Sequence, residues 1–214
     1  MSWQRSDATQ QPYRPYGPAG TPGVPVRRGG RDRMNPIAAA LLVLGVLGLM
    51  WLLEFYDQAT GNSLDQYGIH AREVTGLPEI FSAPFLHGSF EHLQGNSLPF
   101  LVLGFITALG GFARWVKASL ICVIFSGLAA WLLTPMGTIV LGASGLIMGW
   151  LTYVITRGFF DRRPGRIIIG VAVLFFYGGL IWGVFPGQAG ISWQAHLGGA
   201  VGGVVAARVL HGRR

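Results

Sequence analysis

The sequence predicts an all-α membrane protein built as a bundle of six transmembrane helices. Two bulk properties indicate a membrane protein: 51% of the 214 residues are hydrophobic and only 12% are charged, whereas soluble domains carry about 25% charged residues. A third observation gives the helix count, because six apolar segments each approach or reach the ~20 residues that cross a bilayer. We expect these segments at residues 36–53, 93–110, 115–133, 141–156, 167–185 and 193–210.

The first 34 residues precede these segments and differ from them in composition. They are rich in Pro, Gly, Gln and Arg and nearly free of aliphatic side chains, so they cannot bury enough apolar surface to offset the entropy of ordering. We therefore divide the chain into a disordered, basic, Pro/Gly-rich cytoplasmic tail (1–34) and a six-helix domain (35–214). We do not expect a signal peptide, because the apolar segment that begins near Pro36 is too long for one.

The basic residues predict the orientation of the helices. Of the 16 Lys and Arg residues, only Arg72 lies between the first and second segments. The others lie in the tail, near the C-terminus, or in connections that a six-helix chain places on the same face as its termini. Because Lys and Arg gather on the cytoplasmic side, both termini are predicted to be cytoplasmic. The net charge of +7 is then a topology signal, and no nucleic-acid partner is expected.

Polar side chains recur near the starts of the second, fourth and sixth segments. His92 and Asn96 lie four residues apart on one helical face, Ser144 lies near the start of the fourth segment, and His196 lies about one turn into the sixth. These three helices run from the outside inward, so the side chains lie at similar depth. Because polar groups in a membrane normally face the bundle interior or a water-filled cavity, we expect all four to meet.

Small residues on the fourth and sixth helices allow two interpretations of Ser144. They recur at a spacing that lets helix backbones approach closely, at Gly145 and Gly149 and at Ala195, Gly199 and Gly203. In the simpler interpretation, Ser144 only serves this packing. In the other, the close approach brings Ser144 within hydrogen-bond reach of His196, as a nucleophile and its base require. The gathering of polar groups from three helices favours the second interpretation.

The residue types at this depth suit acyl-transfer chemistry. A serine hydroxyl becomes a nucleophile when a neighbouring base takes its proton, and an imidazole has a suitable pKa for that task. A Ser–His–Asp triad would need a nearby acid, but the only acid beyond residue 91 is Asp161, on the predicted cytoplasmic side. We therefore predict a dyad of Ser144 and His196. His92, Asn96 and the Ser144 amide are candidate donors to a tetrahedral oxyanion.

Three segments on alternate helices, HGSFEHLQGN, GASG and AHLGGAVGG, together resemble the motifs of the rhomboid intramembrane serine proteases. The resemblance covers roughly residues 36–210 and leaves the tail unmatched. It implies that Ser144 is the nucleophile and His196 the general base, with Asn96 and His92 stabilising the oxyanion. It also implies that Gly142 opens the turn before the nucleophile.

The chain departs from the rhomboid pattern at some positions. Met148 stands where many rhomboids have a tyrosine whose ring packs on the catalytic imidazole. A thioether can still contact an aromatic ring, so His196 would be held less tightly, or by a neighbour such as Trp193. The first outer loop also lacks a Trp–Arg pair that part of the family carries. His87, the first histidine of the H-x4-H pair, would be structural and shape that loop.

The resemblance implies what the protein acts on and where. The substrates would be single-pass transmembrane proteins, cut in or near their membrane segment on the outer side, after local unwinding of a helix that otherwise hides its carbonyls. They would arrive laterally, past the fifth helix and the outer loop 184–192. Besides these substrates, the lipid bilayer is the expected partner, in a bacterial plasma membrane. No metal or organic cofactor is expected, because the sequence has no H-E-x-x-H motif and its histidines are scattered.

Two rival functions use the same polar residues. A non-catalytic relative would bind membrane clients without cutting them, but it is expected to lack the serine or the histidine, and both are present. A small transporter would spread polar residues through the bilayer depth. Here they cluster near one surface, with Thr152 and Thr156 as modest exceptions.

Overall fold

The structure is a computed structural model that describes residues 33–188 and 190–212, so the predicted tail lies almost entirely outside the described residues. The described part consists mainly of α-helices: α1 (Pro36–Ala59), α2 (Phe90–Ala108), α3 (Phe112–Leu133), α4 (Ser144–Asp161), α5 (Pro164–Tyr177) and α6 (Trp193–His211). A 3-10 helix, η5 (Gly178–Val184), continues α5. A short antiparallel ribbon pairs β1 (Ile69–His70) with β2 (Ile139–Val140), with Ile69 opposite Val140 and His70 opposite Ile139.

Several helices begin at residues that cap them. The side chain of Asn35 accepts a hydrogen bond from the N–H of Ile37 at 2.8 Å, and Pro36 occupies the first position of α1, where an N–H would have no helical partner. Ser89 and Ser192 cap α2 and α6 through their hydroxyls. The two serine caps therefore fix the starts of two of the helices that carry the predicted site.

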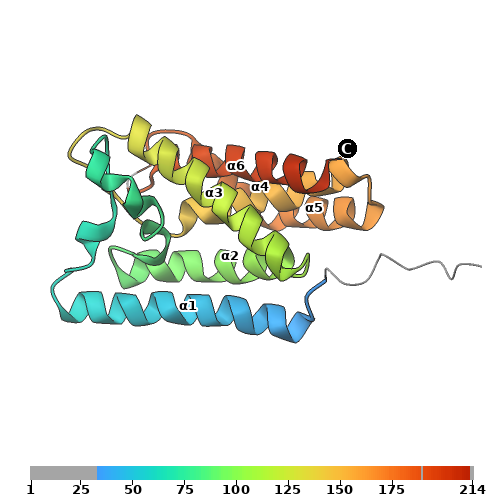
Figure 1. The fold of residues 1–214 in the computed structure, drawn as a ribbon, viewed down its shortest axis with the longest axis horizontal. Helices are drawn as coiled ribbons and strands as arrows, with labels where there is room; N and C mark the ends of the chain where they lie inside the picture. The colour runs from blue at the N-terminus through green and yellow to red at the C-terminus, as the bar shows by residue number, and fades with distance from the viewer. Residues whose placement is uncertain (1–32, 189, 213–214) are drawn as a thin grey trace, which may run out of the picture. The chain divides into compact units, whose positions relative to one another are not determined.

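Helix α4 is the most enclosed helix of the bundle. It packs on α2, α3, α5 and α6, whereas α1 packs mainly on α2 (Figure 1). Its own Trp150 and Tyr153 are fully buried in the core. Helices α1 and α5 instead expose large apolar side chains such as Leu52 and Phe175, as expected of helices whose neighbours are lipid tails.

Within the described residues, three helical segments are long and apolar enough to cross a membrane: Pro36–Ala59, Phe112–Leu133 and Pro164–Val184. Helices α2, α4 and α6 are not among these segments, because they carry more glycines and polar side chains, including Arg157 and Asp161 on α4. These three are also the helices that neighbours shield most from lipid, so they need a less apolar surface. The protein is a helical membrane protein; the six crossings and the cytoplasmic termini stay predictions.

The fourth helix differs from its predicted range at both ends. It begins at Ser144 rather than residue 141, because Gly142 has a φ of +119° that no helix accommodates. It continues to Asp161, beyond the predicted residue 156, and stops where Arg162 adopts a left-handed conformation with a φ of 53°. Ser144 is therefore the first residue of α4.

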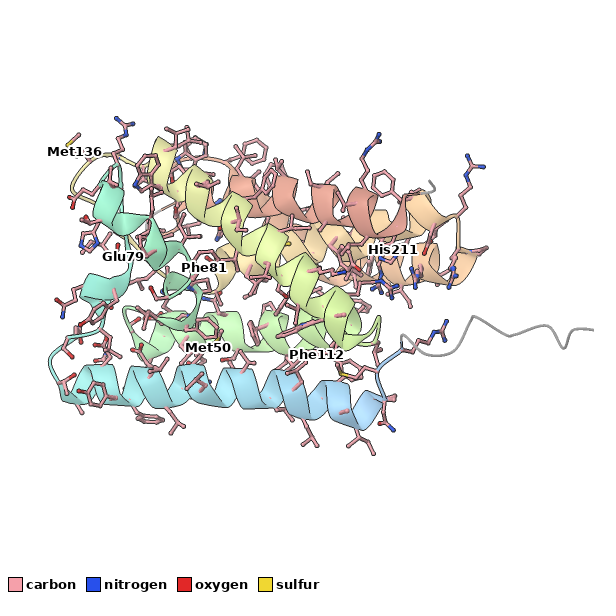
Figure 2. The ribbon with its side chains drawn as sticks, in the orientation of Figure 1. Met50, Glu79, Phe81, Phe112, Met136 and His211 are labelled. Atoms are coloured by element: carbon pink, nitrogen blue, oxygen red, sulfur yellow. The ribbon has the colours of Figure 1, made fainter. Side chains whose placement is uncertain are left out.

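The connection between α1 and α2 lies at the end of the bundle where α2, α4 and α6 begin. Figure 2 shows Glu79 and Phe81 at this end and Phe112 and His211 toward the other. Within the connection, Nδ1 of His70 lies 2.8 Å from Oε2 of Glu79. The hydrogen bond to this carboxylate raises the pKa of His70. The hydrogen bond between His70 and Glu79 thus ties the loop together.

Candidate active site

The four predicted site residues line one cavity of about 450 Å³. His92 and Asn96 reach it from α2, Ser144 from α4, and His196 from α6; Met148 of α4 forms part of the same wall. The sequence predicted that these polar groups would gather at one depth, and the structure places them together. A hydroxyl, two imidazoles and a carboxamide therefore face one space.

The turn before Ser144 depends on Gly142. Its φ of +119° belongs to the region that favours glycine, and its N–H donates to the carbonyl of Ala83 at 2.9 Å. A Cβ atom on Gly142 would lie 2.7 Å from Cε1 of His92, closer than side chains pack. Both the backbone conformation and the contact with His92 therefore require glycine at this position.

His87 holds the same turn from the opposite side. Its Nε2 accepts a hydrogen bond from the N–H of Ala143 at 3.3 Å, so the imidazole is neutral and carries its proton on Nδ1. Burial, with a smaller effect of nearby His92, lowers the pKa of His87 from 6.5 to about 3. This hydrogen bond supports Ala143, the residue before Ser144. It fits the structural role expected of His87.

Helices α4 and α6 approach each other through the small residues that the sequence indicated. A Cβ atom on Gly199 would lie 2.0 Å from the carbonyl oxygen of Gly145, and one on Gly203 would lie 2.0 Å from that of Gly149. No side chain fits at either point. The close approach predicted for these helices is confirmed.

His196 lies in the first turn of α6 and is 9% exposed. Among the described residues, its Nδ1 has no hydrogen-bond partner and its ring makes no hydrogen bond to Ser144. Catalytic hydrogen bonds are often long before substrate binds. The main chain of Gly183 covers the ring, since a Cβ atom there would lie 2.5 Å from Nδ1. Gly183, which the sequence did not indicate, is therefore a neighbour of the His196 ring; the contact expected of Trp193 stays a prediction.

Hydrogen-bond donors are available beside Ser144. Nδ2 of Asn96 is buried and lacks a partner within the described part of the chain, and a buried donor left in this state is costly. The imidazole of His92 packs edge-on against that of His87, with ring centroids 5.0 Å apart. The Ser144 amide is in the first turn of α4, where N–H groups have no helical acceptor. An oxygen atom in the cavity could accept from these groups.

A second cavity, of about 360 Å³, meets the first at Ser144. Both are lined by Ser144, His92, Gly190 and Ile191. The first extends toward Pro99 and Leu180, between α2 and η5, whereas the second extends along residues 138–142 and 192–195. Ser144 therefore lines both the cavity between α2 and η5 and the groove along β2.

Asp161 lies at the far end of α4 from Ser144, about 25 Å away by helical rise. It pairs there with Arg166, whose guanidinium also bonds Nδ1 of His211 at 2.9 Å. Tyr153 bonds the other nitrogen of His211 at 2.8 Å; Figure 2 shows His211 at this end. The prediction that Asp161 stands apart from the site is confirmed.

The fold and the cavity define a membrane-embedded helical bundle with a serine and a histidine facing one interior space. The family model described as Rhomboid domain matches residues 75–213. The chain is also 43% identical to the uncharacterized protein Rv1337 of Mycobacterium tuberculosis, over 81% of this chain and 76% of the relative. It is 44% identical to the uncharacterized protein ML1171 of Mycobacterium leprae, over 83% and 74%. The chain belongs to the rhomboid family.

Proposed function

We propose that the protein is an intramembrane serine endopeptidase in which Ser144 is the nucleophile and His196 is its general base. The observation that carries the proposal is the single cavity lined by Ser144, His196, Asn96 and His92. Membership of the rhomboid family supports it, because these proteins are usually intramembrane proteases. The buried, unpartnered Nδ2 of Asn96 adds support, since a polar group left unpaired in a cavity suits a ligand oxygen.

In this mechanism Ser144 Oγ attacks the carbonyl carbon of the scissile peptide while Nε2 of His196 takes the hydroxyl proton. The oxyanion that forms accepts hydrogen bonds from Asn96 Nδ2, from the Ser144 amide and from His92. The imidazolium then passes its proton to the leaving amine as the C–N bond breaks. A water molecule hydrolyses the acyl-enzyme by the same steps, and Ser144 regains its proton.

The substrates we propose are single-pass transmembrane proteins. A helix in lipid satisfies its own backbone hydrogen bonds, so the segment to be cut must unwind before a carbonyl can reach Ser144. The two cavities that meet at Ser144 suit this requirement. The opening between α2 and η5 would admit the segment from the bilayer beside α5, and the groove along β2 would hold its extended part.

The remaining elements of the proposal concern location. Six crossings with both termini in the cytoplasm would open the cavity toward the outer face of a bacterial plasma membrane, since α2, α4 and α6 all begin at the cavity end. Water for hydrolysis would come from that face. If this orientation is correct, a reporter fused after residue 62 would read the outer compartment and one fused after residue 212 would read the cytoplasm.

The direct test is cleavage of a model transmembrane substrate in proteoliposomes, together with labelling by a fluorophosphonate probe. Ser144→Ala should abolish both, and His196→Ala should reduce both to background, because neither variant can form the activated nucleophile. Ser97→Ala is the matched control: Ser97 lies on α2 and bonds Trp51 at 3.2 Å. Full activity in Ser144→Ala would exclude the proposed dyad.

A non-catalytic, client-binding relative is the other outcome of this test. In that case the wild-type protein would retain a substrate in pull-down experiments without cutting it. It would also show no labelling that Ser144→Ala removes.

A further inference from the structure

One main-chain segment outside the predicted site lies directly on the imidazole of His196. Gly183 is in η5, the 3-10 helix that continues α5, and it is buried. A Cβ atom on Gly183 would lie 2.5 Å from Nδ1, 3.1 Å from Cε1 and 3.8 Å from Cγ of His196. Side chains essentially never pack at the first of these distances. Only the bare backbone of a glycine fits against this edge of the ring.

The nitrogen at this edge of the ring is Nδ1, whereas the proposed general base takes the serine proton with Nε2. If Nε2 of His196 receives the proton of Ser144, Nδ1 must carry a hydrogen, and a buried N–H needs an acceptor. No side chain in the described part of the chain supplies one, since Nδ1 has no hydrogen-bond partner. Met148 of α4, in the same cavity wall, offers only a thioether.

We propose that the backbone of Gly183 positions His196, with its carbonyl oxygen accepting the Nδ1–H hydrogen bond in the reactive enzyme. This inference rests on the proposed function, in which His196 is the base. The bond fixes the tautomer that leaves Nε2 free toward Ser144. When Nε2 takes the serine proton, the Nδ1–H stays on the Gly183 carbonyl, so no further proton moves.

The position of Gly183 also connects His196 with the cavity between α2 and η5. Helix η5 packs on both α5 and α6, and Leu180 of the same 3-10 helix lines the cavity. A segment that enters between α2 and η5 therefore contacts the element that holds His196. Gly183 is a positioning residue in this scheme, because it acts on the substrate only through His196.

The test compares Gly183→Ala with Gly179→Ala, two identical changes in the same 3-10 helix. A Cβ atom on Gly179 has nothing within 4 Å, so this variant controls for the effect of alanine on η5. In Gly183→Ala, His196 must shift by more than half an ångström. We expect kcat and the rate of fluorophosphonate labelling to fall by at least about 10-fold. KM should stay within about twofold, and the unfolding temperature should equal that of Gly179→Ala.

Equal kcat and labelling in the two variants would overturn the inference. Because Gly183→Ala risks misfolding, a second measurement uses the wild-type chain labelled with 15N-histidine. The signal assigned by its loss in His196→Gln should show Nδ1 protonated and Nε2 free; the opposite tautomer would refute the role of Gly183. If the wild-type protein shows neither cleavage nor labelling, the proposed function is refuted. The tautomer of His196 would still test the role of Gly183 in that case.

Discussion

The contact between Gly199 and Gly145 allows a quantitative test of how the two helices set the site. Real Cβ atoms essentially never approach another atom within 3.0 Å, and a Cβ on Gly199 would lie 2.0 Å from the carbonyl oxygen of Gly145. Gly199→Ala must therefore separate α4 and α6 by about 1 Å, the difference between these two distances. The obstacle is backbone, which cannot rotate away as a side chain would.

This separation should affect both stability and activity. Overpacking of a tight contact costs about 1–3 kcal/mol, and misplacing a reacting group by about 1 Å can cost ~100-fold in rate. Gly145 follows Ser144 directly, and Gly199 lies three residues after His196, so the shift falls on the dyad. We expect kcat/KM for a transmembrane substrate to fall by about 100-fold in Gly199→Ala, with a lower unfolding temperature in detergent.

Two matched glycine variants separate these effects. Gly203→Ala meets the same obstacle, 2.0 Å from the carbonyl of Gly149, but further along both helices from the site. It should lose as much stability and less activity. Gly45→Ala on α1 meets nothing within 4 Å and should change neither. The reasoning would be refuted if Gly199→Ala kept the kcat/KM of Gly45→Ala, or if Gly203→Ala were the less active of the two α6 variants.

Two further predictions concern the supports of the site. Because burial holds the pKa of His87 at about 3 and the unfolded value is about 6.5, only the unfolded chain binds this proton between those values. The free energy of unfolding should fall as the pH drops below about 6.5, by at most about 1.4 kcal/mol per pH unit. In His87→Gln it should fall less steeply, and denaturation measured between pH 7 and pH 5 tests both statements. Ser126→Ala removes the 2.9 Å hydrogen bond that the Ser126 hydroxyl donates to the carbonyl of Ala195, the residue before His196. This change should lower the free energy of unfolding by about 1 kcal/mol, and an unchanged unfolding temperature would contradict it.

The helices were predictable because their signals are local. Runs of apolar residues predicted α3, and α5 together with η5, close to their observed ranges, and the glycine spacing predicted the α4–α6 contact. Helix α1 continues to Ala59, beyond the predicted residue 53. The end of the fourth segment was wrong because the residues that follow it, up to Asp161, remain helical without being uniformly apolar. Its start was wrong because a positive φ at Gly142, rather than hydropathy, decides where the helix begins.

The gathering of the four polar side chains was also predictable, because alternate helices of a bundle run in one direction and equal offsets from their starts give equal depths. The contact of Gly183 with His196 was not predictable by this route. Gly183 lies in a 3-10 helix, which does not follow the periodicity of an α-helix. Because glycine has no side chain, the sequence pattern does not indicate which residue its backbone contacts. The hydrogen bond from the Ala143 N–H to His87 was not predictable for a similar reason, since the donor is a main-chain group.

These unpredicted contacts share a physical cause. A membrane interior penalises charge, so a carboxylate beside His196 would itself need a partner to remain ionised. Main-chain groups carry partial charges only, and their burial costs little once each is paired. The supports of the turn before Ser144 also avoid full charges: the carbonyl of Ala83 accepts from the Gly142 amide, and the neutral imidazole of His87 accepts from the Ala143 amide. On the same argument, the acceptor for His196 should be a backbone carbonyl rather than an acid, and Gly183 is the residue whose backbone reaches it.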